Sequence, residues 1–392
     1  MQGAGMQQAV EKVFFSLIRF EINGNESCDE IKNLITPDVL PALFKLSKRH
    51  DLAHLIGDAL DKSGLLPEGT EVKKRFLRER NMAVYRYEQQ QYELEQICEV
   101  LKKAKIPFIP LKGAVMRQYY PEAWMRTSCD IDILIREENL QQVIGVLQEK
   151  IDYRYENTGN HDAHLFAESG VHLELHYKLN PNHEPWNALL ESIWGYLIDG
   201  KAYHGVLTQE MFYFYHIAHM AGHFKVGGCG VRSFLDLFLL RKCISYNQEV
   251  LDGLLEQGGL ESFNQAACAL SDYWFGDGKA TSFILELNDF ILNAGMYGDM
   301  ENRVAIVKAG KKSKCKILFS RIILPYEQLK YKYPTLQKWP ILYPFYVVKR
   351  MFLLFNKDTK KRAVNEFNQT VNGDIEKQDR IAKLLKNLNL QE

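Results

Sequence analysis

Two aspartates stand two residues apart in a stretch where polar and apolar residues alternate. Asp130 and Asp132 lie in SCDIDILI (128–135), and isoleucines take the intervening positions. Alternate residues of a β-strand share a face, so both carboxylates project together while the isoleucines point to the core. The two anions repel each other, and a divalent cation such as Mg²⁺ is the natural ion to neutralise them. Such a pair also occurs on ordinary strands, so it needs further support.

A third carboxylate comes from a later segment with the same alternation. In VHLELH (171–176), His172, Glu174 and His176 occupy one side of the expected strand. If the two strands are neighbours, Glu174 meets the aspartate pair, although a lone strand glutamate is more often solvated. Three carboxylates can hold two metal ions about 4 Å apart, which serves phosphoryl and nucleotidyl transfer. One ion activates the attacking hydroxyl, and the other neutralises the departing pyrophosphate.

Candidate phosphate contacts precede the aspartates. IPFIPLKG (106–113) is typical of a short apolar strand that ends at Lys112 and Gly113, where a helix starts. Glycine lets the backbone approach a phosphate, and helix-start amides attract anions. Arg126 and Ser128 are further nucleotide-binding candidates. A lysine–glycine pair is also a common plain turn, and it is the order of turn, aspartate strand and acidic hairpin strand that favours chemistry.

A histidine repeat lies on a later helix. In the expected helix 209–224, His216, His219 and His223 follow one another at spacings of three and four. Zinc can use such spacing. The glutamate of an H-E-x-x-H motif is absent, however, and the many aromatic residues favour helix packing or an acceptor pocket.

A glycine loop and a second helix follow the histidines. The loop 225–230 can form an anion nest or a plain turn between helices. Arg232 and Asp236 are four residues apart and can pair on a helix surface, or Arg232 can join Lys225 in holding a triphosphate. Five residues are assigned to the substrate side of the site: His176, His223, Lys225, Arg232 and Asp236.

The sequence resembles, over residues 106–180, the nucleotidyltransferase-like proteins of the DNA polymerase beta superfamily. The resemblance is carried by LKGAV, RTSCDIDILI and VHLELHYKL, and is nearest to a bacterial group with an L-K-G signature. It implies Mg²⁺-dependent transfer of a nucleoside monophosphate from an NTP to an acceptor. It also implies that Asp130, Asp132 and Glu174 are the catalytic, metal-binding carboxylates and Gly113 the phosphate-loop glycine. Alanine instead of serine after Gly113, and a long gap before the aspartates, depart from the wider superfamily and fit the L-K-G group.

The elements around these motifs predict an α+β fold. Strand, helix, strand, helix and hairpin follow one another within about 75 residues, whereas apolar spacings of three and four predict helices on both sides. The expected architecture is a small mixed-sheet nucleotidyltransferase core embedded in a mostly helical chain. Four parts are proposed: an N-terminal helical segment 1–100, the core 101–182, a helical domain 183–300 and a basic C-terminal helical region 301–392.

Composition excludes some function classes. Hydrophobic residues make up 46% of the 392 residues, and 49 basic residues balance 49 acidic ones, which excludes a disordered chain and a chain-wide coat for nucleic acid. Charge is distributed unevenly along the sequence, because residues 303–362 contain sixteen Lys and Arg but only two acidic residues. This basic region can bind RNA or a membrane surface, and we favour the alternative that it balances the acidic remainder.

Cysteine usage and hydropathy bear on location. The seven cysteines are widely spaced and contain no C-x-x-C pair, which indicates reduced thiols and a cytoplasmic protein. The N-terminus does not have the pattern of a signal peptide. The apolar run 341–355 is short and interrupted by Lys349 and Arg350, so no transmembrane segment is expected.

Three functional hypotheses remain open at this point. The first is an enzyme that uses Mg²⁺ or Mn²⁺ and an NTP, with ATP favoured, to modify a small-molecule, protein or RNA acceptor. The second is a nucleotide-binding module without turnover, acting as a regulator or as an antitoxin-like partner. The third, and weakest, is a zinc protein centred on the three helix histidines.

Overall fold

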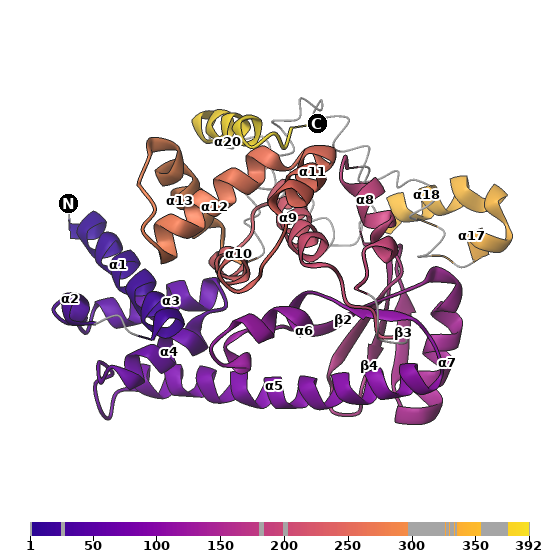
Figure 1. Ribbon diagram of the computed structural model, residues 1–392, viewed down its shortest axis with the longest axis horizontal. Coiled ribbons are helices and arrows are strands. Elements are labelled where there is room, and N and C mark those ends of the chain that lie inside the picture. Colours follow the sequence, from indigo (N-terminus) through magenta and orange to yellow (C-terminus); the bar gives the residue numbers. More distant parts are fainter. Residues whose placement is uncertain are drawn as a thin grey trace.

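Helices dominate the molecule and surround one small sheet (Figure 1). The computed structural model describes residues 2–24, 28–179, 184–198, 203–296, 335–353 and 375–391, with Tyr326, Leu329 and Tyr333. The helices are α1 (Gln2–Asn23), α2 (Asp29–Lys32), α3 (Val39–Arg49), α4 (Ala53–Lys62), α5 (Glu71–Lys103), α6 (Lys112–Met116), α7 (Leu140–Ile151), α8 (Asn187–Glu191), α9 (Gln209–Val226), α10 (Val231–Cys243), α11 (Gln248–Gly258), α12 (Glu261–Phe275), α13 (Ser282–Ala294), α17 (Thr335–Lys338), α18 (Tyr343–Leu353) and α20 (Ile375–Asn387). The predicted α+β class is confirmed.

The sheet is mixed and has five strands. They are β1 (Phe108–Pro110), β2 (Asp130–Ile135), β3 (Arg154–Thr158), β4 (Asp162–Phe166) and β5 (His172–His176), in the spatial order β1-β2-β5-β4-β3. The pair β2–β5 is parallel, and the other neighbours are antiparallel. The predicted aspartate strand and the hairpin β4–β5 are confirmed. The sequence does not predict β3, because its residues are mostly exposed and lack the alternation of a half-buried strand.

One face of the sheet is apolar and packs on two helices. Ile131, Ile133, Leu173 and Leu175 are at most 2% exposed and form one core with apolar residues of α5 and α7. In Figure 1, the long helix α5 runs along the base of the molecule, beneath the strands. The carboxylate-bearing side chains, which alternate with these residues, therefore point to the other face, toward α9.

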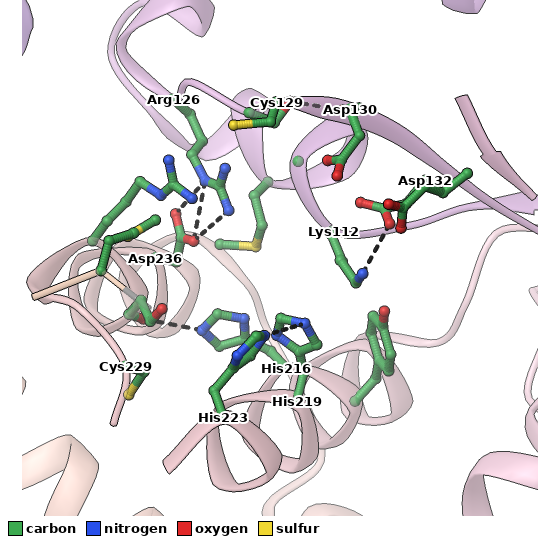
Figure 2. A pocket seen from close by; sticks show the side chains of 18 of the residues that line it. Lys112, Arg126, Cys129, Asp130, Asp132, His216, His219, His223, Cys229 and Asp236 are labelled. Carbon is green, nitrogen blue, oxygen red and sulfur yellow. Dashed lines mark hydrogen bonds and ion pairs between the residues drawn. The ribbon is translucent and has the colours of Figure 1, made fainter. Parts of the chain in front are cut away.

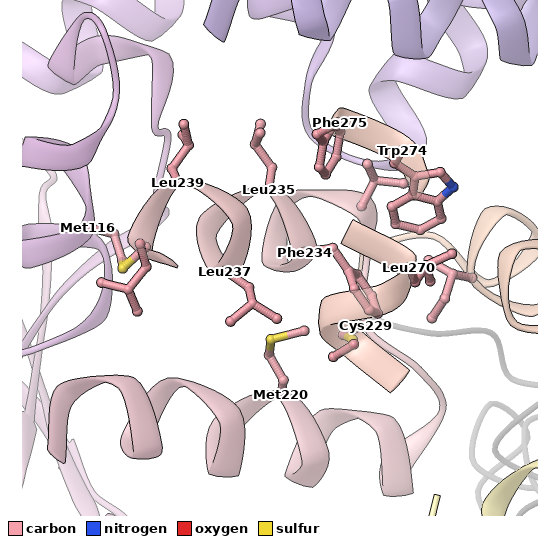
Figure 3. Close-up of a cluster of buried hydrophobic side chains, with 14 of the residues drawn as sticks. Met116, Met220, Cys229, Phe234, Leu235, Leu237, Leu239, Leu270, Trp274 and Phe275 are labelled. Carbon is pink, nitrogen blue, oxygen red and sulfur yellow. The ribbon is translucent and has the colours of Figure 1, made fainter. Parts of the chain in front are cut away.

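A second core joins helices from distant parts of the chain. Residues of α1, α3 and α4 share one hydrophobic cluster with residues of α9, α10, α12 and α13. Figure 3 shows the part where Phe234 and Leu235 of α10 meet Trp274 and Phe275 of α12. The indole Nε1 of Trp274 donates a hydrogen bond of 2.8 Å to Asn288, so this buried polar group is satisfied.

The proposed division into four parts stays a prediction. The boundary at residue 100 falls inside α5, whose last turns belong to the core of the sheet. Most of the basic region 303–362 lies outside the described residues, so its expected role also stays a prediction. Where the structure describes the chain, none of its helices combines the length and apolarity needed to cross a membrane.

Truncating Leu173 tests the placement of the sheet core. Leu173 is fully buried on β5, between β2 and β4. Leu173→Ala removes packed atoms and leaves a cavity, so we expect the free energy of unfolding to fall by about 2–5 kcal/mol. Urea denaturation followed by circular dichroism measures this loss. Glu156→Ala on the exposed strand β3 is the control, with an expected change below about 0.5 kcal/mol. Equal losses in both variants would contradict the assignment.

Candidate active site

The strand register brings three predicted carboxylates to one place. In the parallel pair β2–β5, Asp132 lies opposite Glu174, and Asp130 lies opposite His172. Alternate residues share a face, so the three carboxylates project to the same side of the sheet. All three line one cavity of about 260 Å³ that is also bounded by α9 and α10 (Figure 2).

Most of the other predicted residues line the same cavity. They are Lys112, Gly113, Arg126, Ser128, His223, Arg232 and Asp236. His176 and Lys225 are not part of the lining. The ammonium group of Lys225 instead lies 2.6 Å from Glu184, as an ion pair. Tyr215 and His219 of α9 also line the cavity. His219 belongs to the histidine repeat for which packing or an acceptor pocket was expected, whereas the sequence did not single out Tyr215.

Asp132 is buried between two basic side chains. Its Oδ1 accepts a hydrogen bond of 2.8 Å from Lys112 Nζ and one of 2.7 Å from His176 Nε2. Burial raises the pKa of Asp132, but the charge of Lys112 and the contact with His176 outweigh burial and hold the pKa well below its ordinary value. Burial alone would lower the pKa of Lys112, but the nearby negative charge of Asp132 outweighs burial and raises this pKa above its ordinary value. Both groups are therefore ionised at neutral pH.

The other two carboxylates are destabilised as anions. Burial raises the pKa of Asp130, and the neighbouring charge of Asp132 raises it further. Burial, together with the charges of Asp130 and Asp132, raises the pKa of Glu174 to about 7. This corner of the cavity therefore concentrates negative charge that a bound cation would stabilise.

A compact set of possible metal ligands includes Asp132. One ligand atom from each of Asp132, Glu174 and His176 lies within 4.8 Å of the others. Asp130 borders the same cavity but does not belong to this set. His176, which the sequence assigns to the substrate side, lies behind Asp132 and is 5% exposed.

The turn between β1 and α6 is held tightly against β2. The backbone N–H of Leu111 donates a hydrogen bond of 3.0 Å to the carbonyl of Asp132. Lys112 has a positive φ of 42°, which is uncommon outside glycine. A Cβ on Gly113 would lie 3.0 Å from the Cβ of Ser128, so a side chain there would displace its neighbour. The L-K-G residues therefore have a geometric role beside the aspartates.

Arg126 and Asp236 form a buried ion pair that joins the loop before β2 to α10. Arg126 Nε lies 3.0 Å from Oδ1 of Asp236, and Nη2 lies 2.9 Å from Oδ2. The hydroxyl of Tyr120 donates a further bond of 2.7 Å to Oδ1. The alternative in which Arg232 and Asp236 pair on a helix surface is wrong, because both are buried and Arg232 pairs with Asp51 instead. A phosphate would have to compete with Asp236 for Arg126.

Ser128 belongs to a network that reaches the long helix α5. Its Oγ accepts a hydrogen bond of 2.9 Å from Arg117 Nη2 and donates one of 2.9 Å to the carbonyl of Asp130. Arg117 also donates to Gln90 of α5. The network fixes the chain where it enters β2.

The three helix histidines form one wall of the cavity. Figure 2 shows them on α9, below the cavity. His216 Nε2 lies 3.1 Å from the carbonyl of Ser233, and the Nε2 atoms of His219 and His223 lie 3.1 Å apart. Burial lowers the pKa of His216 and lowers that of His219 further. The compact ligand sets among the described residues do not include these three side chains, which argues against the zinc alternative.

Comparison with known proteins identifies a family. The family model described as an uncharacterised nucleotidyltransferase matches residues 39–276, more than half of the chain. No curated protein and no solved structure matches the chain. The matched span contains all five strands, the three carboxylates and the cavity helices α9 and α10. The expected resemblance to nucleotidyltransferases is confirmed, whereas the bacterial L-K-G group stays a prediction. The chain belongs to this nucleotidyltransferase family.

Proposed function

We propose that the protein transfers a nucleoside monophosphate from an NTP to an acceptor, with Mg²⁺ held by Asp130, Asp132 and Glu174. The observation that carries this proposal is the convergence of these carboxylates in one cavity, on neighbouring parallel strands. ATP is the favoured donor. The acceptor is a small molecule, a protein or an RNA, in the cytoplasm of a bacterium.

The donor set suits a hard divalent cation. Carboxylate oxygens are the protein ligands that Mg²⁺ prefers, and its other positions are commonly filled by water and substrate phosphates. Mn²⁺ accepts the same ligands. The raised pKa values of Asp130 and Glu174 support this assignment, because they reflect anions that are not fully compensated. A bound ion would neutralise charge on the reacting phosphates.

We expect residues beside β2 to contact the triphosphate. Lys112 lies 2.8 Å from Asp132, and its side chain keeps 24% of its surface exposed toward the cavity. This ammonium can therefore contact a phosphate while it stays near Asp132. Gly113, next to it, has no side chain and so leaves room for Ser128 beside the turn. Arg232, in the first turn of α10, lines the same cavity and pairs with Asp51.

The transfer step requires a group that takes a proton. An acceptor oxygen attacks the α-phosphorus of the NTP, the bond to the bridging oxygen breaks, and pyrophosphate leaves. We expect Glu174 or Asp132 to take this proton, since the two carboxylates lie opposite each other in the strand register and border the same cavity. His219 and Tyr215 on α9 face the carboxylates across the cavity and can contact the acceptor.

Replacing both aspartates tests the nucleotide site. Asp130→Asn with Asp132→Asn removes two anions, each worth about 1.5–3 kcal/mol in charged contacts, so Mg·NTP affinity should fall by more than about 100-fold. Titration calorimetry with Mg·ATP measures the loss. Asp130→Asn alone keeps the buried pair of Lys112 with Asp132 and serves as the milder variant. Asp252→Asn on α11, an exposed position, is the control. Unchanged affinity in the double variant would refute the site.

Label transfer separates an enzyme from a binding module. Protein incubated with α-³²P-ATP, Mg²⁺ and a lysate should move label to a small molecule, a protein or an RNA, because the α-phosphate stays with the acceptor. The double aspartate variant should transfer none. Nucleotide binding without any label transfer would favour the alternative of a regulatory or antitoxin-like module.

Removing the charge of Glu174 should stabilise the metal-free protein at high pH. The pKa of Glu174 is raised from 4.5 to about 7, so the wild type loses stability as pH rises through this range, and glutamine does not titrate. After discounting for partial contact with water, Glu174→Gln should raise the free energy of unfolding by about 1–3 kcal/mol at pH 8 and not at pH 4. Urea denaturation in EDTA measures both, with Glu156→Gln as control. A difference that does not vary with pH would contradict the assignment.

A further inference from the structure

We propose that β4 and β5 carry a second metal site, in which His164, His172 and Glu174 bind Zn²⁺ or a similar late first-row ion. The site shares Glu174 with the proposed active site but does not rest on nucleotidyl transfer. One ligand atom from each of the three residues lies within 4.8 Å of the others. The sequence alone indicates no role for His164, and its alternation places His172 only on the same strand face as Glu174.

The strand pairing explains why these side chains converge. His164 lies directly opposite Glu174 in the antiparallel pair β4–β5, and His172 is two residues before Glu174 on the same strand. All three therefore project from one face of the sheet. The ring of His172 stacks on Phe166, with centroids 4.6 Å apart and planes 12° apart, which holds the imidazole in place.

The distances suit a tetrahedral ion. Two nitrogens bound to one zinc at about 2.0–2.1 Å lie roughly 3.3 Å apart in tetrahedral geometry. His164 Nδ1 and His172 Nε2 are 3.0 Å apart, and His164 Nδ1 is 3.8 Å from Glu174 Oε1. Glu174 Oε1 lies 3.9 Å from the other ring nitrogen of His172, Nδ1, so the carboxylate would have to move toward Nε2 for all three groups to share one ion.

The surroundings also resemble a metal site. A metal-bound histidine commonly directs its second ring nitrogen to a carboxylate, and His164 Nε2 lies 3.4 Å from Oδ1 of the buried Asp162. The side chains of His164, His172 and Glu174 are 25%, 21% and 19% exposed, so an ion can enter from solvent. Three protein ligands leave a fourth position open, as in catalytic zinc sites.

Ligand type separates this site from the carboxylate site. Imidazole nitrogens suit zinc, copper, iron and nickel, whereas Mg²⁺ is bound through oxygen. The two rings can also share a simple hydrogen bond without any ion. That alternative accounts for the 3.0 Å contact but gives no reason for the carboxylates of Glu174 and Asp162 to flank the same pair of rings.

Zinc competition tests the site on the full chain. Protein stripped with a chelator is titrated with Zn²⁺ against a chromophoric zinc chelator, without Mg²⁺, because Mg²⁺ at the carboxylate site would also engage Glu174. We expect one tight equivalent, and visible d–d absorption when Co²⁺ replaces zinc. Loss of a residue that only hydrogen-bonds a metal ligand typically weakens metal binding by about 10–100-fold. His164→Gln and His172→Gln each remove a ligand itself, so each should weaken zinc binding by more than this. His204→Gln, which alters a histidine stacked on Phe108 at the β1 edge, should change it by less than about twofold.

Three results would overturn the inference. They are the absence of saturable zinc binding, zinc affinity unchanged in both His164→Gln and His172→Gln, and loss of zinc in His176→Gln alone. The last result would place the ion on the set with Asp132. Thermal melts without metal verify that each variant is folded, and the stoichiometry of the wild type does not depend on any variant. Mg·ATP calorimetry on the same preparations reports separately on the proposed function, so either idea can fail without the other.

Discussion

Repulsion among three carboxylates on adjacent parallel strands is the constraint around which this structure is organised. Lys112 and His176 both contact Asp132 and stabilise its charge, whereas Asp130 and Glu174 are left with raised pKa values. The opposite faces of the same strands carry fully buried isoleucines and leucines. The alternation that crowds the anions therefore also supplies the apolar burial that offsets their repulsion.

A buried ion pair fixes the far wall of the cavity. Arg126 and Asp236 are 110 residues apart in sequence and meet through two parallel contacts, a geometry that arginine forms with carboxylates. Leaving either partner alone in the interior would cost about 3–5 kcal/mol. Arg117 and Ser128 extend the network to α5. A ligand thus meets walls that are already in place, which lowers the cost of binding.

Sequence periodicity predicted the local parts of the site, and tertiary contacts decided the rest. A period of two was enough to place Asp130 with Asp132 and to put Glu174 on the polar side of a hairpin strand. It could not show that β5 lies parallel beside β2, because this pairing depends on the crossover through β3 and β4. It also suggested a pair of Arg232 with Asp236 from their spacing, while the fold gave each a distant partner. The strand β3 was missed because its exposed polar residues carry no alternation.

The order of the elements has a consequence for biosynthesis. The last strand of the sheet ends at His176. The helices that cover its charged face, α9 and α10, come later, and α10 ends at Cys243. At translation rates of 5–20 residues per second, on the order of 10 s separates these points. During this interval the nascent sheet has no cover over its polar face, and the helical layer that joins α1 to α12 cannot close. The apolar residues that α1 contributes to this layer therefore lack their partners on α12 until that helix has been made.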